Sequence, residues 1–147
     1  MRALSRYDGA MDIRVTIGAE RLVARLEQEA APVSCAAFLA LLPLERHLIH
    51  GRWSGESGWA PLGEVGLTLP EENALHRPGP GQMLLYAGDL SEPEILVPYG
   101  LAAFGCKDGP LSGNHILTVT SGAEALPRIG HALLWNGAQV IRFEPIS

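Results

Sequence analysis

DIRVTIGAERLVARL, residues 12–26, is the stretch of this sequence that decides its fold class. Every second side chain in each half of the stretch is apolar: Ile13, Val15 and Ile17 in the first half, then Leu22, Ala24 and Leu26 in the second. A period of two is typical of a β-strand that buries one face, and a glycine lies between the two runs. The stretch is therefore predicted to form a β-hairpin.

The rest of the chain continues in short apolar runs separated by turn-forming residues. Further strands are expected at residues 46–53, 59–62, 65–69, 82–86, 94–98, 115–120 and 138–144. Pro32 is expected to begin a short helix, and the sequence from Ser121 to Glu124 matches a capping box that would open a second helix, with a kink or two joined turns at Pro127. No repeated strand-helix-strand spacing is present. We therefore predict a mainly β fold, a closed barrel of about eight strands with two short helices.

Length and composition indicate one globular domain. A chain of 147 residues with 47% hydrophobic residues has the size of a single domain. We expect residues 1–11 to form a mobile N-terminal leader and residues 12–147 to form one barrel domain. The net charge of -5 and the lack of a basic cluster argue against nucleic-acid binding, and no apolar run approaches the roughly 20 residues of a membrane span. Cys35 and Cys106 are far apart, which is typical of reduced thiols in the cytoplasm, the expected location.

The sequence HGRWSGESGW, residues 50–59, is the candidate site. If the preceding strand continues through it, His50, Arg52 and Ser54 project from one face and offer several hydrogen-bonding groups. The glycines beside Glu56 favour a loop that returns its carboxylate toward a pocket. We therefore predict three catalytic residues: His50 as acid or base, Arg52 as an anion clamp, and Glu56.

Further residues are expected to contact a ligand: Trp53, Ser54, Tyr86, Tyr99 and His115. The two tyrosines end strand-like segments at loops, where barrels usually hold ligands. Each assignment has a structural alternative. Tryptophans often fill a core or a subunit interface, a tyrosine hydroxyl can be satisfied by a neighbouring carbonyl, and Arg52 could pair internally with Glu56 or Glu94.

No metal and no cofactor are expected. His47 and His50 lie three positions apart, which puts them on opposite faces of a strand. A metal site of His50, His115 and Glu56 is possible but has no spacing signature. The sequence also contains no Gly-x-Ser-x-Gly nucleophile elbow and no phosphate-binding loop.

Several stretches carry a resemblance to a known family. Residues 21–27 (RLVARLE), 31–33 (APV) and 35–41 (CAAFLAL) are similar to the opening of cyclophilins, with Ala37-Phe38 where that family has an asparagine-phenylalanine pair. Residues 48–56 (LIHGRWSGE), 84–86 (LLY), 98–100 (PYG), 113–115 (GNH) and 134–139 (LWNGAQ) more closely resemble an uncharacterised family of small bacterial cyclophilin-like proteins, a domain-of-unknown-function group. The resemblance covers most of the chain from Asp12 onward. It implies a cyclophilin-like barrel and no particular activity.

Two function classes follow. The first is a site in a barrel pocket that binds a small carboxylate or amide and either acts on it or only holds it. The second is a non-catalytic oligomeric binding module whose exposed tryptophans meet another subunit. Peptidyl-prolyl isomerisation is a weaker alternative, because the glutamine-glycine-glycine-aspartate run of cyclophilins does not follow Arg52. A homo-oligomer is expected, since aliphatic content is high and aromatic residues gather at strand ends.

Overall fold

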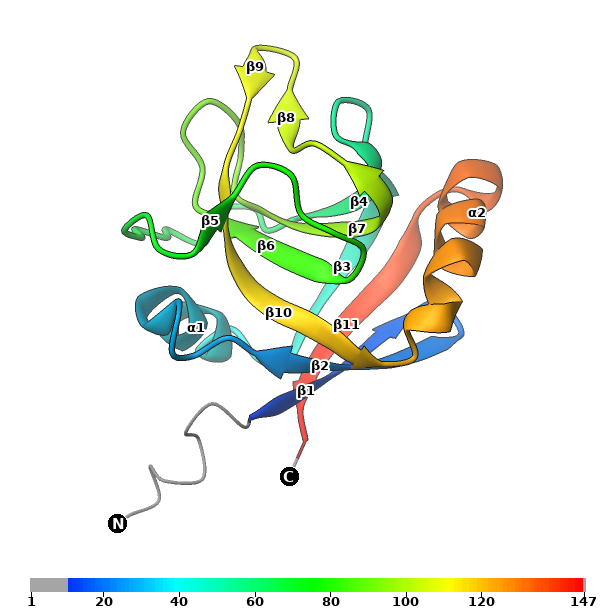
Figure 1. Ribbon diagram of the computed structural model, residues 1–147, viewed down its shortest axis with the longest axis horizontal. Coiled ribbons are helices and arrows are strands. Elements are labelled where there is room, and N and C mark those ends of the chain that lie inside the picture. Colours follow the sequence, from blue (N-terminus) through cyan, green and yellow to red (C-terminus); the bar gives the residue numbers. More distant parts are fainter. Residues whose placement is uncertain (1–10, 147) are drawn as a thin grey trace.

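Antiparallel strands dominate the computed structural model, which describes residues 11–146 (Figure 1). The strands are β1 (Asp12–Ile17), β2 (Glu20–Leu26), β3 (Leu44–His50), β4 (Gly55–Pro61), β5 (Ala74–Leu75), β6 (Gln82–Tyr86), β7 (Glu94–Ala102), β8 (Gly105–Cys106), β9 (Gly109–Pro110), β10 (Gly113–Ser121) and β11 (Gln139–Pro145). Within residues 11–146 the helices are α1 (Pro32–Leu39) and α2 (Leu126–Asn136), and a 3-10 turn lies at Ala123–Ala125. None of the helices in residues 11–146 is long and apolar enough to cross a membrane.

Eight of these strands close into a barrel. They follow one another in the order β2, β1, β11, β3, β4, β7, β6 and β10, and β10 then pairs with β2. The hairpin of residues 12–26 forms as predicted, with Ile13 opposite Ala24 and Val15 opposite Leu22, all four buried. The closed barrel predicted from the sequence is therefore confirmed.

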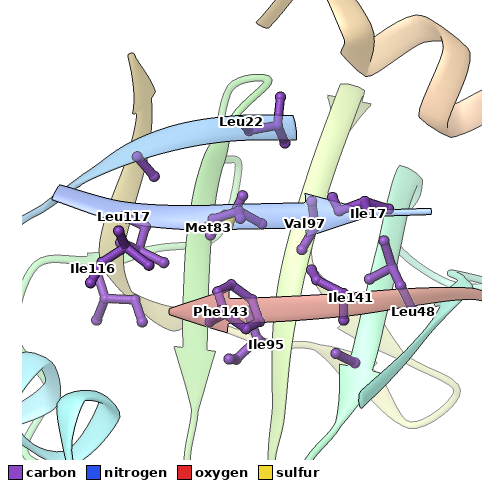
Figure 2. Packing of buried hydrophobic residues seen from close by; sticks show 14 of the residues in the cluster. Ile17, Leu22, Leu48, Met83, Ile95, Val97, Ile116, Leu117, Ile141 and Phe143 are labelled. Carbon is purple, nitrogen blue, oxygen red and sulfur yellow. The ribbon is translucent and has the colours of Figure 1, made fainter. Parts of the chain in front are cut away.

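The interior of the barrel is filled by aliphatic and aromatic side chains (Figure 2). Side chains from opposite walls meet there, including Ile17 from β1, Val97 from β7 and Ile141 from β11. Because this space is packed, the ligand pocket that we expected inside the barrel has to be sought on its outer face.

The two helices pack against different parts of the barrel (Figure 1). Helix α1 begins at Pro32 as predicted, and its Phe38 ring meets Phe143 of β11 edge to face at a centroid distance of 5.3 Å. Helix α2 lies against β3, β4 and β7. The ring of Tyr99 occupies the space that a Cβ at Gly130 would need, so the helix can approach β7 closely only with glycine at this position.

Several predicted elements differ in the structure. The third strand ends at His50 and not at Trp53, and residues 65–69 form no strand. The capping box does not form, because Ser121 is the last residue of β10. Pro127 lies in the first turn of α2, where the missing N–H is tolerated, so α2 has no break there, and the 3-10 turn at Ala123–Ala125 joins directly onto its start.

The predicted leader lies almost entirely outside the described residues. Only Met11 of residues 1–11 is described, and its carbonyl accepts a hydrogen bond from the Leu26 amide. This bond extends the pairing of the first hairpin by one residue.

Candidate functional site

A second apolar cluster lies on the outer face of the barrel wall. Along β7, Ile95 and Val97 point into the barrel, so the alternate residues Glu94 and Leu96 point outward. The outer cluster consists of Leu84, Tyr86, Leu96, Phe104 and Leu111. It anchors residues 103–112, which carry the β8–β9 hairpin at the top of the view in Figure 1.

This hairpin and the turn between β3 and β4 enclose a hollow of about 260 Å³, here called the outer hollow. Its walls include two tryptophan rings, two cationic side chains, one buried carboxyl and one thiol: Trp53, Trp59, Arg52, Lys107, Glu94 and Cys106. Apolar walls with a few polar groups are characteristic of small-molecule sites.

Glu94 is the most unusual side chain of the outer hollow. It is only 5% exposed, yet no hydrogen bond or ion pair joins its carboxyl to another residue of the described chain. Burial, and to a lesser degree the charge of Glu92, raises the pKa of Glu94 to about 8. Near neutral pH this carboxyl therefore exists in both protonation states and can donate or accept a proton.

Arg52 and Trp53 lie at the rim of the outer hollow. Both are exposed, Trp53 to 57%, and within residues 11–146 Arg52 forms no ion pair. The internal pairing of Arg52 with Glu56 or Glu94, which we weighed from the sequence, is not formed. Lys107 of the β8–β9 turn adds a second exposed cation to the same rim.

Ser54 and Tyr86 hold two walls of the outer hollow in place. The Ser54 hydroxyl donates to the Gly105 carbonyl and accepts from the Gly105 amide, both at 3.1 Å, which ties the β3–β4 turn to the β8–β9 hairpin. The Tyr86 hydroxyl accepts the amides of Leu90 (3.1 Å) and Ser91 (3.4 Å). Both hydroxyls are therefore engaged by backbone groups.

His50, Glu56 and Tyr99 form a separate group beside α2. His50 Nε2 lies 2.7 Å from the Tyr99 hydroxyl and Nδ1 lies 2.7 Å from the Gly51 carbonyl, so both ring nitrogens are engaged. Glu56 accepts the Leu101 amide at 2.8 Å. Burial and then the charge of Glu56 raise the pKa of Tyr99.

The predicted catalytic residues are therefore divided between two places. We expected His50 and Arg52 on one strand face. This prediction is wrong, because β3 ends at His50 and Arg52 lies in the following turn. Glu56 was expected in a loop and instead lies in β4. Arg52, Trp53 and Ser54 line the outer hollow, whereas His50 and Glu56 lie beside Tyr99.

His115 belongs to a third place in the fold. Its Nε2 lies 2.8 Å from the Thr118 hydroxyl, which in turn donates to Glu27. Burial lowers the pKa of His115 and so favours the neutral ring. No group of three or more His, Cys, Asp or Glu side chains in residues 11–146 could hold a metal ion, so His50, His115 and Glu56 do not form such a group.

Glu94 is the functional candidate that we missed, because we considered it only as a partner for Arg52. Its position gave one usable signal: in a strand that starts at residue 94 it faces away from Ile95. What the sequence did not show is the long segment 103–112 that covers that outer face and buries the carboxyl.

Three comparisons with known proteins bear on this chain. A family model described as "Protein of unknown function (DUF3830)" matches residues 13–144. A search of curated proteins gives no match.

Several solved structures share the fold, and two of them are compared with this chain. The structure of McbB in complex with tryptophan has a TM-score of 0.67 and 18% identity over 90% of this chain and 44% of McbB, so this chain spans less than half of McbB. A hypothetical protein from Archaeoglobus fulgidus has a TM-score of 0.64 and 17% identity over 94% of this chain and 96% of that protein. At 17–18% identity these comparisons show a shared fold only.

Proposed function

This chain belongs to the DUF3830 family of proteins of unknown function, and from that premise we propose that it binds a small carboxylate or amide ligand in the outer hollow. We also propose that its barrel is of the cyclophilin-like type, which is supported by the strand, proline and helix that open the chain at residues 20–39. A cytoplasmic location remains part of this proposal.

The guanidinium of Arg52, which forms no ion pair within residues 11–146, is the observation that carries the proposal. A guanidinium offers a planar fork of donors that matches a carboxylate, and Lys107 adds positive charge on the same rim. Trp53 and Trp59 provide apolar walls for the rest of the ligand. An amide ligand would use the same donors through its carbonyl oxygen.

The comparison with McbB supports a small-molecule role for this fold. Tryptophan, the molecule named in the McbB structure, carries a carboxylate and an apolar ring, the two features for which the outer hollow has partners. His50 is a weaker candidate for chemistry on the ligand, because both of its ring nitrogens are engaged and it lies beside Tyr99.

Replacing Arg52 by methionine tests the proposal. Hydrogen bonds to a charged group contribute about 1.5–3 kcal/mol, so we expect carboxylate affinity to fall by roughly 10- to 100-fold. The melting temperature should change little, because the side chain is exposed and forms no ion pair within the described chain. Titration calorimetry with acetate, benzoate, indole-3-acetate and the matching amides provides the measurement.

Arg14→Met is the matched control, because Arg14 is an exposed arginine on β1 and does not line the outer hollow. This control should bind as the wild type does. Equal affinities of wild type and Arg52→Met for every ligand that binds would contradict the anion clamp. A much lower melting temperature of Arg52→Met would instead assign Arg52 to the scaffold.

Exposed apolar side chains support a second candidate role, an oligomeric binding module. Trp135 and Leu134 at the end of α2 and Leu101 at the end of β7 are all more than half exposed, Trp135 to 75%. Large exposed aromatics are enriched at subunit interfaces. We propose that the chain forms a two-fold homodimer through this surface, without a nucleic-acid or membrane partner.

Light scattering tests the dimer. The expected particle mass is twice 15.7 kDa at micromolar concentration, and Trp135→Glu should shift it toward the monomer because a charge cannot be buried in an apolar contact. Val33→Glu, at an exposed valine of α1, is the control and should leave the mass unchanged. A 15.7 kDa wild-type particle would rule the dimer out.

A further inference from the structure

The outer hollow holds both positively and negatively charged side chains. A simple carboxylate ligand would pair only with the positively charged ones. Such a ligand satisfies Arg52 and Lys107 at the rim but brings no hydrogen-bond donor for the oxygens of Glu94. The Glu94 side chain is 5% exposed, and its carboxyl oxygens would keep only a narrow contact with solvent and no partner in the protein or the ligand, which leaves most of their hydrogen-bonding capacity unused. The ligand is therefore expected to bring a donor group for Glu94.

We propose that the ligand of the outer hollow is a free α-amino acid with an apolar side chain. Its carboxylate is bound by Arg52, its ammonium group by Glu94, and its side chain lies against Trp53 and Trp59. This inference rests on the proposed function and adds the ammonium group to it.

The charges of the outer hollow select for a zwitterion. A simple amine leaves Arg52 and Lys107 without an anionic partner, and a dicarboxylate places a second negative charge beside Glu94 and Asp108. A zwitterion avoids both conflicts. The indole faces of the walls also attract an ammonium group that is removed from water.

Binding of an ammonium group also predicts the release of a proton. In the free protein burial holds the pKa of Glu94 at about 8, so its carboxyl is mostly protonated at pH 7. A bound ammonium favours the carboxylate, and the proton of Glu94 passes to the buffer. The other ionisable groups facing Glu94 are Glu92 on the preceding loop, Tyr86 on β6, Arg52 on the β3–β4 turn, and Cys106, Lys107 and Asp108 on the β8–β9 hairpin.

Titration calorimetry at pH 7 in phosphate and in Tris tests the inference, since the two buffers differ in ionisation enthalpy. The probes are L-phenylalanine and L-leucine, each beside its analogue without the amino group, 3-phenylpropionate and 4-methylpentanoate, and its analogue without the carboxylate. At least one amino acid should bind tenfold or more tightly than both of its analogues. That amino acid should release between about 0.5 and 1 proton, whereas its deaminated analogue should release almost none.

Two variants separate the inference from the proposed function. Glu94→Gln should abolish proton release and reduce the preference for the amino acid over its deaminated analogue to less than about threefold, while binding of the analogue persists. Arg52→Met should weaken both ligands. Equal binding of amino acid and deaminated analogue to the wild type without proton release would overturn the amino-acid assignment and leave the carboxylate site. Absence of binding by any probe would overturn both.

Discussion

At pH 8.5, replacing Glu94 by glutamine is expected to raise the free energy of unfolding of the ligand-free protein by about 3 to 6 kcal/mol. The pKa of Glu94 is raised to about 8 in the folded protein from an ordinary value of 4.5, mainly by burial. Each pKa unit corresponds to about 1.4 kcal/mol of preference for the protonated form in the folded state. Glutamine resembles that neutral form and never has to ionise, so it removes the penalty.

Because the pKa of Glu94 is higher in the folded than in the unfolded protein, the stability difference between wild type and Glu94→Gln grows as the pH rises. Below pH 4.5 the carboxyl of Glu94 is protonated in both states, so wild type and Glu94→Gln should be close in stability. Between pH 4.5 and 8 the unfolded state ionises first, and the wild type loses stability relative to the variant as pH rises. Above pH 8 both states are ionised and the difference becomes constant.

Urea unfolding at pH 4.5, 7 and 8.5 measures this difference. Glu92→Gln is the control, because Glu92 is exposed and lies two residues before Glu94, on the loop that precedes β7. We expect that control to change the pH profile far less. If the stability of Glu94→Gln runs parallel to that of the wild type at all three pH values, Glu94 ionises freely and is not a buried acid.

Replacing Phe143 by alanine is expected to lower the free energy of unfolding by about 3 to 5 kcal/mol. Phe143 is completely buried in the barrel interior (Figure 2), and its ring also holds α1 through the edge-to-face contact with Phe38. Loss of the ring leaves a cavity that the closed wall cannot collapse around, because neighbouring strands stay hydrogen bonded.

Val140→Ala on the same strand is the matched control, since Val140 is 45% exposed and should cost less than about 1 kcal/mol. Both variants are compared by urea unfolding. Phe38→Leu and the double variant then measure the ring-ring coupling, expected at about 0.5–1.5 kcal/mol. A loss below 1 kcal/mol for Phe143→Ala would contradict the packing described here.

The parts of the fold that the sequence predicted well are those specified by local periodicity. The hairpin of residues 12–26 alternates buried and exposed side chains, and β6 begins and ends where the pattern of residues 82–86 predicted. A helix starting at Pro32 also depends on a local preference. Such signals need no knowledge of distant residues.

The errors arose where distant residues decide the structure. Ser121 satisfied a local helix signal, but pairing with Val23 of β2 keeps it in β10. The third strand stops early because the turn after His50 closes on itself through the Gly51 amide and the Ser57 carbonyl. Burial of Glu94 depends on residues 103–112, whose position over β7 no local pattern shows.

The outer cluster has a further consequence for protein engineering. Because it anchors the hairpin independently of the barrel interior, the loops at residues 51–54, 87–93 and 103–112 can serve as a cassette for changing ligand preference. Randomising their exposed positions should spare the thermostability that the barrel provides, so long as Ser54, Tyr86 and Phe104 are kept. A library built in this way separates the selection for binding from the selection for folding.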